Sequence, residues 1–272
     1  MKPQEHSGCC LTIAGSDSGG NAGVQADLRA FHAYGLHGCT AFAALTAQNP
    51  FGVSAIHAVP AAFVGAQLDA VLGVYDIRAL KTGMLAEPEI IETVADRLSR
   101  HPEIAKVVDP VMVATSGAKL ISDAAVETLQ ARLLPLATLI TPNLPEAEAL
   151  CGRQASAREL AAELYGRFGC AVLVKGGHGR GSEAVDVLYD GKDFGEFSLP
   201  RVENPVSTHG TGCSLAAALA AELCLGHGLA ESVAGAKRYV YAAIANSYRV
   251  GADCGVLGFV DLQCVSAGQS VR

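Results

Sequence analysis

The strongest chemical signal in the chain is a run of small and polar residues directly before an apolar helical segment, Thr208-His209-Gly210-Thr211-Gly212-Cys213-Ser214. The two glycines of the run allow the backbone to turn sharply and to expose successive N–H groups. The N-terminus of the helix that follows adds about half a positive charge at the same place. The run therefore predicts an anion site suited to a phosphoryl group during its transfer.

Cys213 stands at the start of that helix, where the pKa of a thiol falls from about 8.5 toward neutrality. We expect Cys213 to take the proton of an alcohol that is held at the anion site. A helix cap with a buried cysteine is the alternative interpretation, and the run alone does not separate the two.

A second pattern, Asn143-Leu144-Pro145-Glu146, follows a predicted strand. Its three-residue spacing across a helix start places the amide and the carboxylate on one face. A carboxylate at Glu146 can hold Mg²⁺ against phosphates, usually through water. The same spacing resembles a capping box, and the two roles are compatible. Lys175, beside two glycines at the end of another strand, either contacts a nucleotide phosphate or is solvated.

Apolar strand patterns alternate with helical patterns along most of the chain, which predicts an α/β fold with a mainly parallel sheet and helices on both faces. Strands are expected at 11–14, 39–45, 53–58, 77–81, 106–109, 139–141 and 171–175. Helices are expected at 22–34, 61–74, 87–98, 123–134, 157–168, 212–225 and 231–248. Two strand patterns at 183–189 and 194–199, separated by Asp190-Gly191-Lys192-Asp193, predict a small β-hairpin.

Ligands of open parallel sheets bind beyond the carboxyl ends of the strands. The side chains that follow the apolar runs are therefore expected to gather at one edge of the sheet. They are Asp17, Gln48, Lys81, Met84, Asp109, Asn143, Glu146 and Lys175.

Composition narrows the class of protein. Of the 272 residues, 50% are apolar and 17% are charged, which excludes a disordered or coiled-coil chain. The net charge of −7 argues against a nucleic-acid surface. The apolar stretch 213–225 is broken by Glu222, which favours a buried helix over a membrane span. Nine scattered cysteines without a CxxC pair are typical of a reduced cytoplasmic protein. No linker interrupts the single domain that we expect over residues 1–272.

Two common nucleotide signatures are missing from the sequence. The Walker pattern G-x-x-x-x-G-K-[ST] does not occur, which excludes a P-loop enzyme. The first glycine-rich turn, residues 15–23, does not fit G-x-G-x-x-G, which disfavours a dinucleotide-dependent oxidoreductase.

Eight segments, in order along nearly the whole chain, resemble those of the hydroxymethylpyrimidine/phosphomethylpyrimidine kinases of the ribokinase-like superfamily. The segments are 11–17, 23–28, 44–49, 81–85, 108–112, 141–147, 174–178 and 209–213. The resemblance implies a three-layer α/β sandwich. It also implies MgATP-dependent phosphorylation of 4-amino-5-hydroxymethyl-2-methylpyrimidine, and then of its monophosphate, in thiamine biosynthesis. Members of this family are often dimeric, so a homodimer is expected.

The resemblance also implies a role for each residue that matches a motif. The aminopyrimidine is expected to contact Gly15, Asp27, Gln48 and Met84. ATP is expected to contact Asp109, Asn143, Lys175 and Thr208, with Mg²⁺ at Glu146. The anion hole is expected to comprise Gly210, Thr211, Gly212 and Cys213, and Cys213 is the implied catalytic base.

A cysteine at position 213 favours the pyrimidine kinases and the related pyridoxal kinases over the sugar kinases, many of which carry Asp there. Pyridoxal kinase activity is therefore the nearest alternative, and a non-catalytic pyrimidine-binding regulator is a more remote one. In the first glycine-rich loop, Asn21 stands where the family commonly has glycine. Asparagine tolerates a left-handed backbone, so we expect the turn to form.

Overall fold

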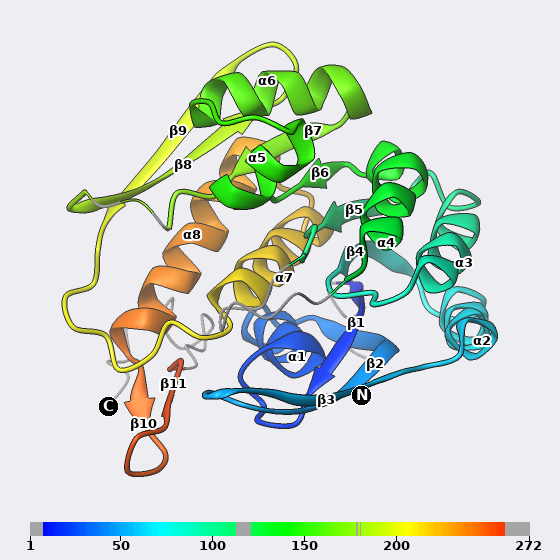
Figure 1. Ribbon diagram of the computed structural model, residues 1–272, viewed down its shortest axis with the longest axis horizontal. Helices are drawn as coiled ribbons and strands as arrows, with labels where there is room; N and C mark the ends of the chain where they lie inside the picture. The colour runs from blue at the N-terminus through cyan, green and yellow to red at the C-terminus, as the bar shows by residue number, and fades with distance from the viewer. Residues whose placement is uncertain (1–7, 113–120, 178, 180, 259–272) are drawn as a thin grey trace, which may run out of the picture.

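A nine-stranded sheet forms the centre of the structure, a computed structural model that describes residues 8–112, 121–177, 179 and 181–258 (Figure 1). The strand order is β3-β2-β1-β4-β5-β6-β7-β8-β9. Neighbouring strands from β2 to β7 pair in parallel, whereas β3, β8 and β9 add antiparallel pairs at the two ends. The strands are β1 (Cys9–Asp17), β2 (His37–Asn49), β3 (Gly52–Ala58), β4 (Ile77–Thr82), β5 (Ala105–Val108), β6 (Leu139–Ile140), β7 (Ala171–Val174), β8 (Glu183–Tyr189) and β9 (Phe194–Pro200).

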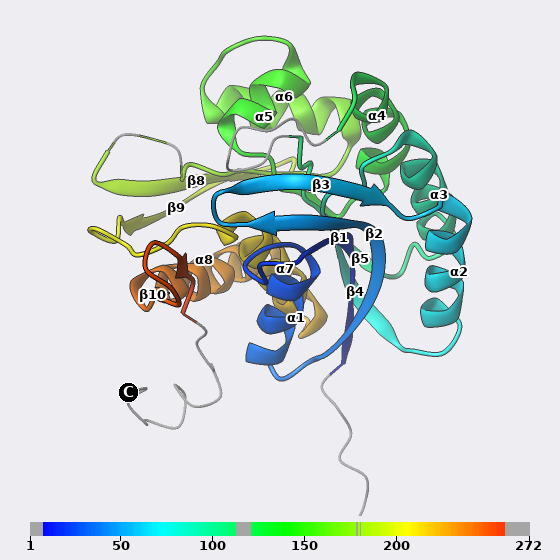
Figure 2. The ribbon, with the colours of Figure 1, turned by 60° about the horizontal axis from the view of Figure 1, so that its bottom comes forward.

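Helices cover both faces of the sheet, which confirms the expected three-layer α/β sandwich (Figure 2). One face carries α1 (Gly23–Ala33), α7 (Thr211–Cys224) and α8 (Leu229–Ala245). The other carries α2 (Ala61–Leu72), α3 (Pro88–Leu98), α4 (Asp123–Thr128), α5 (Leu144–Cys151) and α6 (Ala157–Phe168). Successive residues of a strand point to opposite faces. Accordingly, Leu11 and Ile13 of β1 belong to the core under α2–α6, and Cys10 belongs to the core under α1, α7 and α8.

The predicted hairpin is present as β8 and β9. The Oδ1 atom of Asp190 accepts hydrogen bonds of 2.9 Å from the backbone N–H groups of Lys192 and Asp193, and these bonds close the turn. A second sheet, formed by β10 (Tyr248–Arg249) and β11 (Gly255–Val256), was not predicted. Two residues per strand are too few for a recognisable alternation of side chains.

The helix expected at 123–134 is regular over only its first half. α4 ends at Thr128, and the chain continues as a π-helical turn at Leu129–Leu133 and a 3₁₀ turn at Leu134–Leu136. Pro135 accounts for the change, because proline has no N–H group and its ring clashes with the carbonyl four residues earlier. A regular α-helical ladder therefore cannot pass through this segment.

The last helix was expected at 231–248 but begins at Leu229 and ends at Ala245. The side chain of Asn246 donates a 2.8 Å hydrogen bond to the carbonyl of Ala242, one of the acceptors that the helix end leaves open. The chain leaves the helix there and enters β10.

The order of the strands reverses next to β1. The chain runs from β1 outward to β2 and β3, and then returns to β4 on the other side of β1. In open α/β sheets, ligands bind at such a reversal, beyond the carboxyl ends of the strands. The loops that follow β1 and β4 therefore mark the expected position of a binding site.

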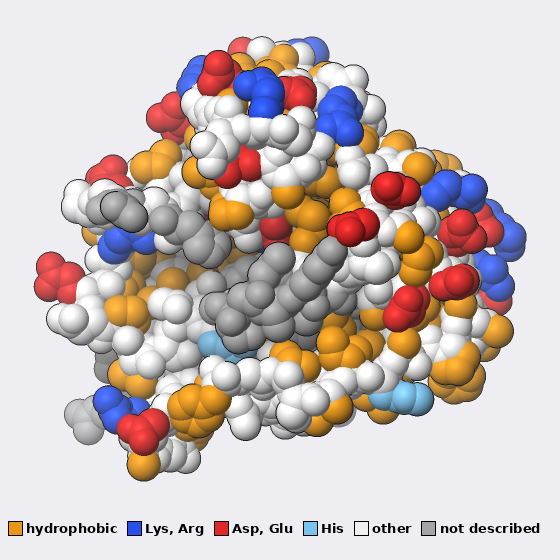
Figure 3. Space-filling view, in the orientation of Figure 1, with side chains coloured by type: hydrophobic (Ala, Val, Ile, Leu, Met, Phe, Trp, Pro, Cys, Tyr) orange, Lys and Arg blue, Asp and Glu red, His pale blue; other side chains and the backbone are white. Residues whose placement is uncertain are grey.

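The surface has the mixed charge of a solvated face. On the side seen in Figure 3, basic and acidic side chains are interspersed over the helices at the top and at the right. Within the described residues, no helix has both the length and the apolar character needed to cross a bilayer.

Candidate active site

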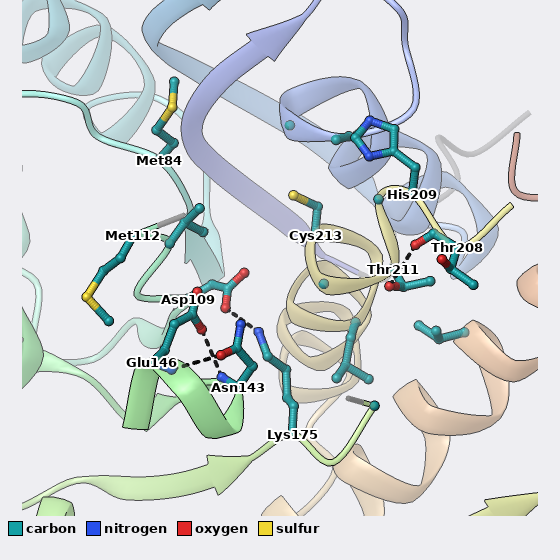
Figure 4. A pocket seen from close by; sticks show the side chains of 18 of the residues that line it. Met84, Asp109, Met112, Asn143, Glu146, Lys175, Thr208, His209, Thr211 and Cys213 are labelled. Carbon is teal, nitrogen blue, oxygen red and sulfur yellow. Dashed lines mark hydrogen bonds and ion pairs between the residues drawn. The ribbon is translucent and has the colours of Figure 1, made fainter. Parts of the chain in front are cut away.

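A cavity of about 1130 Å³ lies at the reversal of the strand order, beyond the carboxyl ends of the central strands. It brings together every residue that the family motifs single out except Asp27. The residues that line it are Gly15, Gln48, Met84, Asp109, Asn143, Glu146, Lys175, Thr208, Gly210, Thr211, Gly212 and Cys213. Figure 4 shows the charged and amide side chains at one end of the cavity and Cys213 pointing into its middle. His178, which belongs to one of the motifs, lies outside the described residues.

The predicted anion loop is formed by residues 208–212 and leads into α7. Gly210 is the N-cap of α7 with a φ of 88°, a conformation that favours glycine. The hydroxyl and the backbone N–H of Thr211 both donate to the carbonyl of Thr208, at 3.0 and 3.4 Å. A Cβ atom on Gly212 would lie 3.8 Å from the Nζ of Lys175, so the loop faces this cation. Backbone donors and a positive charge thus meet at one place.

The turn after β1 packs directly against the anion loop. The carboxylate of Asp17 accepts hydrogen bonds of 2.8–2.9 Å from the N–H groups of Gly19, Asn21 and Ala22. The turn forms as expected, but the left-handed residues are Gly20 and Gly23 on either side of Asn21. The turn is stabilised by the hydrogen bonds that Asp17 accepts, so Asn21 does not have to adopt a left-handed conformation.

Asp17 also faces His209 of the anion loop, with 3.7 Å between its Oδ2 and the Nε2 of the imidazole. Burial alone would raise the pKa of Asp17. The hydrogen bonds from His209 and from the backbone N–H groups of the turn outweigh burial and hold this pKa below its usual value. Asp17 is therefore a carboxylate over the whole neutral range, and it joins the turn after β1 to the anion loop.

The side chain of Cys213 projects from the first turn of α7 into the cavity (Figure 4). The backbone N–H of Gly23, at the start of α1, favours the thiolate and lowers the pKa of Cys213. Burial raises the pKa of Cys213, and the ammonium of Lys81 opposes this effect. The expected shift toward neutrality is therefore wrong, because the loss of hydration outweighs the favourable charges. The thiol therefore predominates at neutral pH, and the thiolate that can accept a proton is the minor form.

Asn143 and Glu146 form a complete capping box at the start of α5, one of the two roles expected for them. The Oδ1 of Asn143 accepts from the N–H of Glu146 at 2.9 Å, and the carboxylate of Glu146 accepts from the N–H of Asn143 at 2.8 Å. Burial, opposed by the charge of Lys175, raises the pKa of Glu146 to about 7. Glu146 also lines the cavity, so the cap is compatible with a metal ligand.

Lys175 and Asp109 form an ion pair of 2.7 Å across the floor of the cavity. Asp109 follows β5 and also accepts a 3.0 Å hydrogen bond from the hydroxyl of Thr141, which follows β6. Burial lowers the pKa of Lys175, but the charges of Asp109 and Glu146 outweigh burial and raise it. Lys175 is therefore a permanent cation beside the anion loop.

The opposite end of the cavity combines apolar and amide groups. A Cβ on Gly15 would lie 2.7 Å from the methyl carbon of Met84, so a larger residue there would displace the flexible end of the Met84 side chain. The amide of Gln48 lies 3.1 Å from the hydroxyl of Thr46 and 3.4 Å from the Nε2 of His209. An apolar methyl group and an amide that line one cavity suit a flat ring with polar edges.

Asp27 does not line the cavity. It is fully buried one layer behind, where its two carboxylate oxygens lie 3.0 and 2.9 Å from the Nζ of Lys81. The hydroxyl of Thr12 donates a third hydrogen bond, of 2.6 Å, to the same carboxylate. A direct contact between Asp27 and a substrate stays a prediction, and in this structure Lys81 stands between the two.

The cavity also contains side chains that were not among the predicted site residues, and three of them are His209, Lys237 and Arg201. His209 was passed over inside its motif, although it links Gln48 with Asp17. Lys237 of α8 is nearly buried and lies 2.6 Å from Asp186 of β8, which also accepts from the N–H of Gly176 at 2.8 Å. A lysine on the otherwise apolar face of 229–245 was the available signal. Arg201 is the third, and its guanidinium donates to three carbonyls of the loop after β7, those of residues 176, 177 and 181.

Known proteins with the same motifs include several biosynthetic kinases. The chain is 48% identical over 245 residues to the hydroxymethylpyrimidine/phosphomethylpyrimidine kinase of Rhizobium meliloti, and the match covers 88% of this chain and 91% of that protein. It is 49% identical over 241 residues to the thiamine biosynthesis bifunctional protein ThiED of Geobacter sulfurreducens. That match covers 87% of this chain but 49% of the bifunctional protein, so the chain spans about half of its length.

Among solved structures, the pyridoxal kinase of Bacillus subtilis in complex with ADP superposes with a TM-score of 0.86 at 34% identity, over 94% of this chain and 98% of that one. The sequence model of the phosphomethylpyrimidine kinase family matches residues 17–258, which include every strand of the main sheet beyond β1 and every residue of the cavity described above from Asp17 onward. The chain belongs to the phosphomethylpyrimidine kinase family.

Proposed function

We propose that this chain transfers the γ-phosphoryl group of ATP to the hydroxymethyl group of 4-amino-5-hydroxymethyl-2-methylpyrimidine, and then a second phosphoryl group to the monophosphate, in thiamine biosynthesis. One observation carries the proposal. The glycine-rich anion loop, the permanent cation Lys175 and the thiol of Cys213 open into the same cavity as the apolar and amide groups around Gln48. Family membership and the names of close relatives support the same activity.

The acceptor is assigned to the end of the cavity that contains Gly15, Gln48 and Met84. The backbone at Gly15 and the methyl group of Met84 lie close together and both line the cavity, where they offer an apolar surface to an aromatic ring. The amide of Gln48 both donates and accepts, which matches the neighbouring amino group and ring nitrogen of an aminopyrimidine. In this position the hydroxymethyl group points toward Cys213.

The phosphates of ATP are assigned to the other end of the cavity, near Lys175, Asn143 and Thr208, with Asp109 orienting Lys175. Gly210, Thr211 and Gly212 supply backbone N–H groups toward the charge that develops on the transferred phosphoryl group. Each well-placed donor of this kind contributes roughly 10²–10³ in rate.

Magnesium is part of the proposal, and the donors present fit it. The carboxylates of Glu146 and Asp109 and the amide oxygen of Asn143 are the hard oxygen ligands that Mg²⁺ prefers, and they lie at the end of the cavity assigned to the phosphates. When bound, the ion neutralises charge on the phosphates of ATP. The protein's own contribution is to hold these oxygens in place through the capping box of α5.

Cys213 is proposed as the base. As the hydroxyl oxygen of the acceptor attacks the γ-phosphorus, the bond from that phosphorus to the leaving oxygen of ADP breaks. The O–H bond of the acceptor also breaks, and its proton goes to the thiolate form of Cys213. General-base assistance of this kind contributes about 10²–10⁴ in rate. Positioning and charge stabilisation supply the larger share, because phosphoryl transfer needs little covalent chemistry from the protein.

The test is product mass after incubation with MgATP and three acceptors in parallel: the hydroxymethylpyrimidine, its monophosphate and pyridoxal. We expect conversion of the first two, with slow or no conversion of pyridoxal. Absence of product from all three acceptors, in a folded protein that binds ATP, would contradict the proposed activity.

Pyridoxal kinase is the second candidate, favoured by the superposition with the Bacillus subtilis enzyme. Pyridoxal is also a flat ring with a hydroxymethyl group, so the same anion loop and base suit it. Pyridoxal phosphate as the dominant product of the three-acceptor experiment would assign the chain to this activity instead.

Three further expectations stay proposals. We propose one kinase domain over the chain, a homodimer as its assembly and a cytoplasmic location. Light scattering on the purified protein tests the dimer, and a mass of one chain would contradict it.

A further inference from the structure

A fully buried ion pair lies behind Cys213, on the side of the sheet covered by α1 and α7. The Nζ of Lys81 is 2.9 Å from the nearer carboxylate oxygen of Asp27, and neither side chain is exposed to solvent. Lys81 is on β4, Asp27 on α1, and Thr12, which donates to Asp27, on β1. The pair therefore joins the two strands at the reversal of the sheet to the helix that precedes β2.

The stability of the fold is a weak explanation for the presence of this buried ion pair. Removing two charges from water costs about as much as their attraction returns, so buried pairs are often replaced by apolar residues without loss of stability. Lys81 stays protonated, because burial lowers its pKa but the charge and hydrogen bond of Asp27, together with other nearby negative groups, outweigh burial and raise it. The pair is thus a fixed dipole inside the protein.

The dipole points its positive end at the cavity. Lys81 lines the cavity, and Asp27 lies behind it. α7 packs against both β4 and α1, and Lys81 and Cys213 line the same cavity. The largest influence that favours the charged form of Cys213 is Lys81, ahead of the hydrogen bond from the N–H of Gly23, and Asp27 acts in the opposite direction.

The other charged groups around Cys213 are themselves paired. Asp109, beyond β5, disfavours the thiolate, but its carboxylate is held by Lys175, beyond β7, at 2.7 Å. On α8, the helix packed against the far side of α7, Lys237 is held by Asp186 at 2.6 Å. Asp109 and Asp186, the partners of Lys175 and Lys237, line the cavity. Asp27, the partner of Lys81, does not.

We propose that Lys81, held by Asp27, is a positioning residue that sets the proton affinity of Cys213. Its ammonium stabilises the thiolate that receives the hydroxyl proton of the acceptor, and Asp27 limits this stabilisation. During transfer the O–H bond of the acceptor breaks, a new bond forms between its oxygen and the γ-phosphorus, and the bond from that phosphorus to ADP breaks. The thiolate of Cys213 takes the proton, and the resulting thiol returns it to solvent after product release. This inference rests on the proposed function of Cys213 as the base.

The test removes the dipole without leaving an unpaired charge. In the variant Asp27→Asn/Lys81→Met, the amide keeps an acceptor for Thr12 and the thioether fills the space of the lysine stem. Alkylation of Cys213 by iodoacetamide is followed on its own peptide by mass spectrometry as a function of pH. The matched control is Asp186→Asn/Lys237→Met, which removes a similar buried pair on the far side of α7.

We expect the first variant to fold and its alkylation midpoint to move to higher pH, so that the rate at a fixed pH below the midpoint falls about tenfold or more. The control is expected to keep the wild-type midpoint. The pH profile of kcat should move in the same direction as the alkylation curve. A folded Asp27→Asn/Lys81→Met protein whose curve coincides with that of the wild type would overturn the proposal.

If the double variant does not fold, the single variant Lys81→Gln gives the same comparison, because its amide can still hydrogen-bond Asp27. An unshifted alkylation curve in that variant would contradict the proposal as well. The alkylation readout also separates the two proposals. A chain that phosphorylates none of the three acceptors fails the proposed function, whereas Cys213 still reports whether Lys81 sets its proton affinity.

Discussion

The anion loop makes a sharp prediction about Gly210. Its φ of 88° lies in the left-handed region, where a Cβ costs about 1–2 kcal/mol. A Cβ at this position would also overlap the carbonyl oxygen of Asn21 and lie 2.9 Å from the carbonyl carbon. Both obstructing atoms belong to the backbone, so the substitution Gly210→Ala forces the loop away from the turn after β1.

The size of the effect follows from the required movement. Relieving the overlap takes a displacement of roughly 1 Å, and a misplacement of about 1 Å costs on the order of 10²-fold in rate. We therefore expect kcat/KM of Gly210→Ala to fall about 100-fold, equivalent to about 2.7 kcal/mol of transition-state stabilisation. The loss should appear mainly in kcat, because the loop N–H groups act on charge that develops during transfer.

Gly226, just beyond α7, offers a matched control. It has the same φ of 88°, and a Cβ there would have no neighbour within 4 Å. Gly226→Ala should lose about 1–2 kcal/mol of unfolding free energy in urea. Gly210→Ala should lose more, because its Cβ also overlaps the carbonyl of Asn21, and only Gly210→Ala should lose turnover in an assay of phosphorylated product. Activity of Gly210→Ala within threefold of Gly226→Ala would refute the assignment of this loop to the transferred phosphoryl group.

Three further predictions concern the neighbouring side chains. Cys213→Ala should keep the fold and ATP binding and lose about 10²–10⁴ in kcat; near-normal kcat would remove Cys213 from the mechanism. Lys175→Met should weaken binding of a non-hydrolysable ATP analogue by roughly 10- to 100-fold, the value of a charged hydrogen bond, and calorimetry showing unchanged affinity would contradict its assignment to the phosphates. Asp17→Asn should lower the unfolding free energy by about 1–3 kcal/mol at pH 7. Because the folded pKa of Asp17 is lowered, this difference should hold down to about pH 4, the usual pKa of Asp, and disappear as the pH falls through the folded value. A difference that persists unchanged at pH 2 in urea titrations would contradict this account.

Much of the fold could be predicted from the sequence because local patterns and tertiary structure agree. The helix predicted at 157–168 is present with the same ends, since Ser156 and Glu159 form a capping box and Gly169 takes a φ of 72°. The helix predicted at 123–134 is not regular, because Pro135 disrupts a segment whose apolar spacing otherwise fits a helix. The spacing of apolar residues indicates which side chains face the core, but it does not indicate whether the backbone hydrogen bonds of the helix continue.

Some features of the site could likewise be predicted from the sequence, and others could not. The rule that ligands bind beyond strand ends predicted that Gln48, Met84 and Lys175 gather at one place, and they line one cavity. The pKa of Cys213 could not be predicted, because it depends on burial and on Lys81, 132 positions earlier in the chain. Asp27 illustrates the same limit. Its motif marks it as important, but only the structure pairs it with Lys81, 54 residues away.

The contact between the anion loop and the turn after β1 has a thermodynamic consequence. Gly210 touches the carbonyl of Asn21, and His209 stands between Asp17 and Gln48. The loop that faces the phosphates and the turn that borders the acceptor therefore cannot move independently. Coupling between two ligands is reciprocal, and typical values correspond to factors of about 5–150 in affinity. An acceptor that orders this turn reduces the conformational entropy that is lost when the nucleotide binds, so the affinity for the nucleotide rises. The bound nucleotide raises the affinity for the acceptor by the same factor.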